Sequence, residues 1–325
     1  MNTNEAFEAS PAALQAVQSA TANDIRLYPS PSSHELKNKL AKHYSMSPDQ
    51  VVVGNGSDDI LNLIVRTCCE MNDKLVTTNP AYSLYPILSS IQGINFEAIP
   101  CKDEFALDID KIIGAHGQVT LITSPNNPAG TAYDPANIRL ICESGNNLVV
   151  IDEAYAEFAD QNALSLLGEF ENLCVVRTFS KSYGLAGLRI GYLLGHEEFC
   201  AQIQKVKDSY NVNRLAQIAA LAALSDQDWA QNMWSTVRKR RIWLTDQLNQ
   251  IKGLSPYPSQ ANFVLVDCGE HKASHLYHSL ENRQVLVRYL PHVRGAENAL
   301  RITVGTQNEL DTLIDYLKAI ISDTM

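Results

Sequence analysis

Residues 173–192 read LCVVRTFSKSYGLAGLRIGY, and this stretch decides the fold class of the chain. It opens with the apolar run Leu173–Val176, which is typical of a strand covered on both faces of a sheet. Lys181 follows Ser180 in a segment that is otherwise apolar and rich in glycine, and Arg189 lies eight residues further on. A serine hydroxyl and a guanidinium suit a phosphate, and a lysine amine can form a Schiff base with an aldehyde. The alternative, an ordinary solvated lysine, is disfavoured by these apolar neighbours.

Outward from this stretch, short β-rich runs alternate with helical stretches up to about Gly195. Residues with helical spacing, such as Ile60, Ile64 and Cys68, lie between the runs. Most runs are continuously apolar rather than alternating, which predicts a mainly parallel sheet with helices on both faces. The runs are Val51–Val53, Leu75–Thr78, Ile94–Ile99, Val119–Thr123, Leu148–Asp152, Leu173–Thr178 and Leu188–Leu194.

After Gly195 the pattern changes to a long helical region followed by three β-like runs and two further helical stretches. We expect a smaller α+β domain here, which also takes up the N-terminal helix Pro11–Ala20. The predicted division is residues 25–230 for the large domain, and residues 1–24 with 231–325 for the small one. The segments are, in order, Ala201–Ala223, Trp229–Leu248, Ala261–Asp267, Ala273–Glu281, Val285–Leu290, Leu300–Val304 and Asn308–Ile321.

The composition is that of an ordinary globular protein. A chain of 325 residues is too long for one simple core, so two domains are expected. The hydrophobic fraction of 45% is typical, and the net charge of −10 argues against a general nucleic-acid binder. No apolar run approaches the roughly 18 residues that span a bilayer, and the first residues carry no secretory signal, so no membrane partner is expected.

The cysteines and histidines point to neither a disulfide framework nor a metal site. The seven cysteines are scattered, odd in number and without a C-x-x-C pair, which favours a reduced, cytoplasmic protein. The eight histidines show no H-E-x-x-H or other metal spacing, so no catalytic metal is expected.

Residues that follow the predicted strands are candidates for a site, because ligands bind at the carboxyl ends of strands in such sheets. The turn GNGSDD at residues 54–59 places Ser57 and Asp58 at the start of a helix. Backbone N–H groups at a helix start can hold a phosphate, although an ordinary strand-to-helix turn has the same residues.

Two further strand ends carry polar side chains. Asp152 ends a buried run, and a carboxylate in that place is costly unless it meets a cation, such as a pyridinium N–H, or caps a helix. The turn SPNNPAG at residues 124–130 is fixed by proline and glycine. The amide of Asn127 could donate from that turn to a ligand oxygen, or the turn could be structural alone.

Taken in order, these signals resemble the fold-type-I pyridoxal-5′-phosphate (PLP) enzymes, and most closely the histidinol-phosphate aminotransferase family. The resemblance covers nearly the whole chain. It implies a PLP-dependent transferase fold of type I, with a seven-stranded mostly parallel sheet, flanking helices and a smaller α+β domain. The motifs that carry it are Asn4-Glu5, LYP at 27–29, GNGSD at 54–58, PAYSLY at 80–85, SPNNPAG at 124–130, DEAY at 152–155, TFSK at 178–181, GLRIG at 187–191, YPSQANF at 257–263 and LRITVG at 300–305.

The resemblance implies a role for each residue around the cofactor ring. Lys181 would carry the internal aldimine, and Asp152 would face the ring nitrogen. Tyr155 and Asn127 would bond the ring hydroxyl, while Tyr82 would stack on the ring. Asp152 would keep the ring nitrogen protonated through a charge-assisted bond worth roughly 1.5–3 kcal/mol. The free amine of Lys181 would then shift the proton that makes the reaction a transamination.

The cofactor phosphate would be held by four residues of the same chain and one of its partner. Ser57, Asp58, Ser180 and Arg189 would bind it, the first two mainly through backbone N–H groups. Tyr28 would reach the phosphate of the partner subunit, since active sites of the family lie at a homodimer interface.

For the substrate, the resemblance implies an amine donor and a 2-oxo acid acceptor: histidinol phosphate and 2-oxoglutarate would give imidazole acetol phosphate and glutamate. Arg301, assisted by Arg288, would bind the phosphate, although Arg288 could be a surface charge at a strand end. Asn4 and Glu5 would border the substrate together with Asn127. The residues after Asn4-Glu5 depart from the family pattern, Asn-Pro-x-Gly.

Three other functions stay open at this point. Threonine-phosphate decarboxylase belongs to the same family but is a lyase. An aromatic or other amino-acid aminotransferase would need only one arginine for the α-carboxylate. A non-enzymatic PLP-binding regulatory domain is the third, and it normally follows a DNA-binding module.

Overall fold

The computed structural model describes residues 1–145 and 147–323. Among them, seven strands form the larger sheet, in the order β1-β7-β6-β5-β4-β2-β3. Pairing is parallel among β2 to β6, whereas β7 is antiparallel to both of its neighbours. The predicted mostly parallel sheet is therefore confirmed. The strands are β1 (Val51–Gly54), β2 (Lys74–Asn79), β3 (Asn95–Pro100), β4 (Val119–Thr123), β5 (Leu148–Asp152), β6 (Leu173–Thr178) and β7 (Gly191–Gly195).

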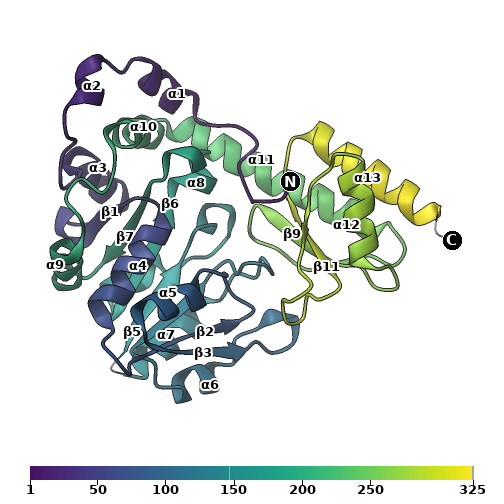
Figure 1. Ribbon diagram of the computed structural model, residues 1–325, viewed down its shortest axis with the longest axis horizontal. Coiled ribbons are helices and arrows are strands. Elements are labelled where there is room, and N and C mark those ends of the chain that lie inside the picture. Colours follow the sequence, from purple (N-terminus) through teal and green to yellow (C-terminus); the bar gives the residue numbers. More distant parts are fainter. Residues whose placement is uncertain (146, 324–325) are drawn as a thin grey trace.

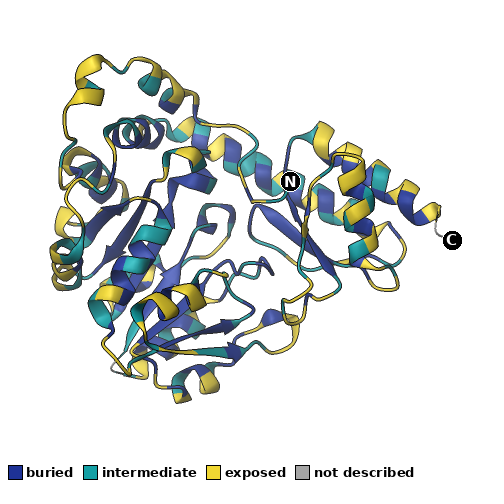
Figure 2. Ribbon diagram, in the orientation of Figure 1, coloured by how far each residue is buried: buried dark blue, intermediate teal, exposed yellow. Residues whose placement is uncertain are grey.

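Helices cover both faces of this sheet, as the apolar runs predict (Figure 1). On β5, Val150 packs into one cluster, which includes Ile60 and Ile64 of a helix. Its neighbours Val149 and Ile151 point to the opposite face and into a different cluster. The central strands are buried throughout and stand out in Figure 2. The helices are α3 (His34–Tyr44), α4 (Ser57–Cys68), α5 (Tyr85–Gln92), α6 (Ile109–Gly114), α7 (Pro135–Glu143), α9 (Glu197–Val206) and α10 (Arg214–Ser225).

The smaller sheet is antiparallel, with the strand order β10-β11-β9-β8. Its core is a separate cluster, to which Val264 and Leu300 contribute from the strands and Leu313 from a helix. The predicted run Val285–Leu290 yields a strand of two residues alone, β10. The elements are β8 (Ser255–Pro256), β9 (Phe263–Asp267), β10 (Arg288–Tyr289), β11 (Ala299–Thr303), α11 (Gln227–Asn249), α12 (Ala273–Asn282) and α13 (Gln307–Ser322).

One expectation about the N-terminal helix is wrong. Helix α1 (Pro11–Gln18) packs against α10 and belongs to the cluster around β1 and β7, not to the small sheet (Figure 1). The reason is the small size of the facing side chains: Ala13 meets an alanine-rich face of α10, so the two helix axes can approach closely. Residues before α1 do reach the small sheet, because the backbone N–H of Thr303 donates to the Met1 carbonyl. The predicted boundary at residue 230 between the larger and the smaller domain remains our proposal.

Two other segments differ from the sequence expectation. The helical region Ala201–Ala223 is broken at residues 207–213, where Asn211 donates to the Val53 carbonyl and to Asp59. Strand β7 begins at Gly191 instead of Leu188, because Arg189 has a left-handed backbone with φ of 51°.

No helix in the described ranges is long and apolar enough to cross a membrane. The short elements are α2 (Ala22–Arg26), α8 (Phe179–Ser182) and the 3-10 turns η1 (Pro48–Gln50), η2 (Asp103–Phe105), η3 (Ala156–Phe158), η4 (Leu164–Gly168) and η5 (Ala186–Leu188).

Candidate active site

A cavity of about 390 Å³ lies between the carboxyl ends of the large-sheet strands and the face of the small sheet. That volume is in the range of small-molecule sites. All of the predicted site residues except Tyr28 and Glu5 line it: Asn4, Ser57, Asp58, Tyr82, Asn127, Asp152, Tyr155, Ser180, Lys181, Arg189, Arg288 and Arg301. Residues that are far apart in sequence therefore meet in one place.

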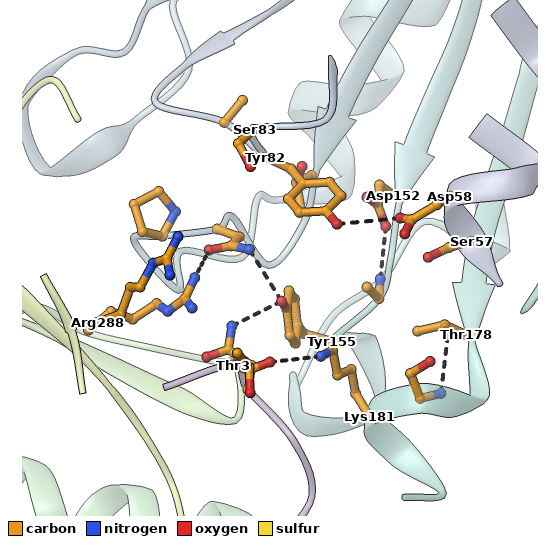
Figure 3. A pocket seen from close by; sticks show the side chains of 18 of the residues that line it. Thr3, Ser57, Asp58, Tyr82, Ser83, Asp152, Tyr155, Thr178, Lys181 and Arg288 are labelled. Atoms are coloured by element: carbon orange, nitrogen blue, oxygen red, sulfur yellow. Dashed lines mark hydrogen bonds between the residues drawn. The ribbon is translucent and has the colours of Figure 1, made fainter. Parts of the chain in front are cut away.

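Lys181 reaches the cavity from α8, directly after β6. The hydroxyl of Thr178 accepts from the Ser180 backbone N–H at 3.1 Å and so fixes the start of this helix. The Lys181 Nζ donates to the carbonyl oxygen of Thr3 at 3.1 Å (Figure 3). Burial, with a smaller effect of Arg301, lowers the pKa of Lys181 to about 8. About a tenth of the amine is therefore uncharged at pH 7, far more than for an ordinary lysine, and the uncharged form is the one that a nucleophile or base requires.

Asp152 stands at the end of β5 and is 3% exposed. Its Oδ2 accepts from the Tyr85 hydroxyl at 2.9 Å, and its Oδ1 accepts from the Ala154 backbone N–H at 3.2 Å. Burial raises the pKa of Asp152 to about 6, and the two hydrogen bonds oppose that rise. Among the described residues, no cationic side chain forms a salt bridge with this carboxylate. A cationic ligand in the cavity would supply the missing partner.

The hydroxyl oxygen of Tyr155 accepts hydrogen bonds from two side-chain amides in the middle of the cavity. Asn4 Nδ2 donates to it at 3.1 Å and Asn127 Nδ2 at 3.3 Å (Figure 3). Since both amides donate, the proton of the Tyr155 hydroxyl stays free for an oxygen of a ligand. Burial raises the pKa of Tyr155, and the charge of Arg301 opposes that rise.

The start of α4 and the loop before β7 form a second polar wall. Arg189 Nη2 bonds Asp58 Oδ2 at 3.1 Å, and the Tyr82 hydroxyl donates to Asp58 Oδ1 at 3.4 Å. A Cβ on Gly191 would lie 2.5 Å from the Ser57 backbone nitrogen, so glycine is needed for this close approach. The Ser180 Oγ is buried and has no hydrogen-bond partner within the described residues. The wall therefore offers backbone N–H groups, a guanidinium and an unused hydroxyl, which together suit a phosphate.

The opposite end of the cavity carries two arginines from neighbouring strands. Arg301 is 9% exposed; it donates to Asn127 Oδ1 and, at 2.9 Å, to the Asn2 carbonyl. Its Nε is buried without a partner among the described residues. Arg288 is exposed and points into the same cavity (Figure 3). It stands opposite Arg301 in the β10–β11 register. In the part of the chain that the structure describes, neither guanidinium is in a salt bridge, so both are available to an anion.

Two predicted residues lie outside this cavity. Glu5 is exposed beside it, and its charge raises the pKa of Lys181 against the stronger effect of burial. Tyr28 is 77% exposed and stacks on Tyr210 with ring centroids 4.6 Å apart, while Arg214 donates to the Tyr28 carbonyl at 2.7 Å. The segment around Tyr28 is thus held in place while its ring faces solvent.

Several residues at the site escaped the sequence reasoning. The carbonyls of Asn2 and Thr3 bind Arg301 and Lys181, and a backbone carbonyl leaves no signal in a sequence. Thr123 lines the cavity, and Tyr85 supports Asp152 from behind it. Both could have been noticed, since Thr123 ends a buried run and Tyr85 ends the motif PAYSLY. Over residues 1–145 and 147–323, no group of three His, Cys, Asp or Glu side chains could hold a metal ion.

Comparison with known proteins defines the class of the chain. A sequence profile described as "Aminotransferase class I and II" matches residues 1–317. The chain therefore belongs to the class I and II aminotransferase family, and the predictions of family and enzyme class are confirmed.

Within that class, the curated relatives carry a more specific name. The histidinol-phosphate aminotransferase of Microcystis aeruginosa is 38% identical over 321 residues, which cover 99% of this chain and 91% of the relative. That of Clostridium botulinum is 34% identical over 327 residues, covering 99% and 92%. The crystal structure of histidinol-phosphate aminotransferase from Sinorhizobium meliloti in complex with pyridoxal-5′-phosphate is 30% identical, with a TM-score of 0.92 over 100% of this chain and 91% of that one. The predicted fold is confirmed by this likeness.

The fold does not separate all of the functions that the sequence left open. The L-threonine-O-3-phosphate decarboxylase of Porphyromonas gingivalis has a TM-score of 0.85, covering 99% of this chain and 98% of its own. At 22% identity this likeness shows the shared fold alone. The reaction must therefore be argued from the site.

Proposed function

We propose that this aminotransferase uses PLP to transfer the amino group of histidinol phosphate to 2-oxoglutarate. One observation carries the choice of substrate: Arg301 and Arg288 line the cavity of Lys181 and Asp152, and neither forms a salt bridge within the described chain. Two guanidinium groups side by side suit a dianionic phosphate better than a single carboxylate. The names of the curated relatives support the same substrate.

The residues present fit PLP. The unused Ser180 Oγ, the start of α4 and Arg189 would hold its phosphate, and Gly191 allows the start of α4 to approach β7 closely. The free proton of Tyr155 would serve its ring hydroxyl, and Asp152 would face its ring nitrogen. When bound, the cofactor supplies a cationic ring that withdraws electrons from the substrate carbon that loses a proton.

The chain's own residues hold and move the protons. Without a cationic partner, Asp152 has a pKa of about 6, only about one unit below neutral pH. A cation beside it would lower that pKa, so the carboxylate would stay ionised at neutral pH. It then holds the proton on the ring nitrogen. Lys181 has a pKa of about 8, and its Nζ would take the proton from the substrate carbon that bears the amino group. It would then return that proton to the cofactor carbon joined to the same nitrogen.

A panel of amine donors tests this proposal. With 2-oxoglutarate as acceptor, glutamate formation should be fastest with histidinol phosphate and much slower with histidinol and with aromatic amino acids. Preference for a plain amino acid would instead support the second candidate, in which Arg301 alone holds an α-carboxylate. Carbon dioxide release from threonine phosphate, without glutamate formation, would overturn the transfer reaction itself.

We further propose a homodimer in which Tyr28 completes the partner's site. Ile25, Leu27 and Tyr28 are 74%, 46% and 77% exposed, and this apolar segment is fixed by Arg214 and Tyr210. Such a patch is typical of an interaction surface.

Mixing inactive variants distinguishes shared from separate sites. Subunits with Lys181→Ala and subunits with Tyr28→Ala should be unable to sustain normal turnover alone. After dissociation and reassociation, mixed dimers should regain activity, because one of their two sites then has neither substitution. A chain that sediments as an active monomer, or variants that never complement, would contradict the shared site.

We also propose that the enzyme works in a reducing compartment such as the cytoplasm. All seven cysteines lie within the described residues and are free. Burial raises the pKa of Cys68 and of Cys142 to about 12, so these thiols stay protonated and unreactive. Retention of full activity in excess reductant would support this placement, whereas loss of activity on reduction would contradict it.

A further inference from the structure

A buried tyrosine supports the active-site carboxylate from outside the cavity. Tyr85, the first residue of α5, is 0% exposed, and its hydroxyl bonds Asp152 Oδ2 at 2.9 Å and the Thr123 hydroxyl as well. We propose that Tyr85 is a positioning residue: oriented by Thr123, it holds the Asp152 carboxylate in place and ionised for the cationic ring of the cofactor. The inference rests on the proposed function only in taking that cofactor to be PLP.

The direction of these hydrogen bonds follows from the chemistry of the groups. An ionised carboxylate can only accept, so the Tyr85 hydroxyl must donate its one proton to Asp152. The remaining lone pairs of Tyr85 then accept the proton of Thr123. Thr123 ends β4 and stands beside Asp152 in the β4–β5 register, so both strands present their last residues to the same tyrosine. A chain of donors thus points toward the carboxylate.

The sequence motif PAYSLY explains how one segment serves both sides of the carboxylate. Tyr82 lines the cavity, whereas Tyr85 lies behind it, and their rings meet edge to face at 5.8 Å. Burial and the charge of Asp152 raise the pKa of Tyr85 well above its usual value. The tyrosine therefore keeps its proton throughout any ordinary assay range and remains a donor.

Without Tyr85, little else would favour the ionised form of Asp152. The remaining donor is the Ala154 N–H at 3.2 Å, which is the longer of the two bonds. Charge interactions link the carboxyl group to acidic or phenolic side chains, namely Asp58, Glu153, Tyr82, Tyr85 and Tyr155. The cations Lys181 and Arg189 line the same cavity but bond elsewhere, to the Thr3 carbonyl and to Asp58. Hydrogen bonds to the charged form lower the pKa of a carboxyl group, so removing one must raise it.

A double-mutant cycle on cofactor affinity tests the proposal without any substrate. The dissociation constant for PLP is measured in the wild-type chain, in Tyr85→Phe, in Asp152→Asn and in the double variant. Tyr85→Phe should weaken binding by about tenfold, the equivalent of roughly one pKa unit, and should shift the acidic limb of its pH dependence upward. In the Asp152→Asn background the same change should cost less than about threefold.

Two further variants separate positioning from a merely structural role. Tyr133→Phe removes another buried hydroxyl, which donates to the Phe105 carbonyl at 3.1 Å outside the cavity. It should lower the unfolding temperature and leave the PLP dissociation constant unchanged. Thr123→Val should also weaken PLP binding, but by less than Tyr85→Phe. If Tyr85→Phe fails to fold, Thr123→Val takes its place in the double-mutant cycle with Asp152→Asn.

The outcomes are distinct. Equal losses from Tyr85→Phe with Asp152 and with Asn at position 152 would overturn the proposal, as would an unshifted pH profile. A chain with no affinity for PLP would instead overturn the proposed function, whereas failure to use histidinol phosphate would leave the cycle intact.

Discussion

The substitution Arg301→Ala tests whether this arginine binds the phosphate group of the substrate. Arg301 is nearly buried, and a hydrogen bond to a charged group in such a place contributes about 1.5–3 kcal/mol. Loss of its contact should therefore lower kcat/KM for histidinol phosphate by about ten- to a hundredfold. Arg288 is exposed, and a solvent-screened ion pair is worth roughly 0.2–1 kcal/mol, so Arg288→Ala should lower kcat/KM by at most about fivefold.

The assay follows glutamate formation with histidinol phosphate and, in parallel, with histidinol. Histidinol lacks the phosphate, so neither substitution should change its kcat/KM by more than about twofold. Arg301 Nη1 also bonds Asn127, whose amide donates to Tyr155, so a purely structural effect is the rival explanation. Equal losses with the two donors would refute the reasoning, because they would mean that Arg301 acts on Tyr155 rather than on an anion.

Three other predictions concern the cofactor side of the cavity. Lys181→Ala should abolish the covalent attachment of PLP, and borohydride treatment of the wild-type chain followed by peptide mapping should mark Lys181; a different labelled lysine would contradict the site. Asp152 has its pKa raised from 3.8 to about 6 in the folded chain, so the fold binds more protons than the unfolded chain between these values, and stability falls as pH rises through this window. Without cofactor, Asp152→Asn should therefore remove up to about 3 kcal/mol of this pH-dependent loss, measured by denaturant unfolding at pH 4 and pH 7; identical pH dependence in both proteins would show that Asp152 is not buried as described. Gly191→Ala, whose Cβ would meet the Ser57 nitrogen, should weaken PLP binding by more than about tenfold, whereas Gly187→Ala, with open space around it, should not; similar affinities in the two variants would exclude a phosphate at this wall.

The parts of the site that the sequence predicts are those in which side-chain chemistry and strand pattern coincide. Asp152 and Lys181 each follow a continuously apolar run, and the sheet brings the ends of such runs together. Arg301 also follows from its motif, and the structure gives it the burial that a strong anion contact needs.

The parts that the sequence could not predict depend on the backbone or on packing between distant helices. Thr3 contributes a carbonyl to Lys181, which any residue type could do. Helix α1 joins the large sheet because the faces of α1 and α10 match in size, a property of the pair and not of either helix. At the break over residues 207–213, Asn211 bonds Val53 of β1 and Asp59 in the first turn of α4, and no local pattern encodes these contacts.

The contacts made by the first residues of the chain have a consequence for how the protein folds during synthesis. Asn4 bonds Thr303 and Asn262, which lie 299 and 258 positions later in the chain, and Met1 also bonds Thr303. The first residues therefore cannot form these contacts until the distant partners have been synthesised. Contacts of such long sequence separation form late in folding, because a long loop must close before they stabilise anything. A nascent chain on the ribosome can build most of the large sheet, yet the wall that faces Lys181 and Arg301 is assembled only after β11 has emerged. Cofactor capture should therefore follow the emergence of β11 rather than completion of the large sheet.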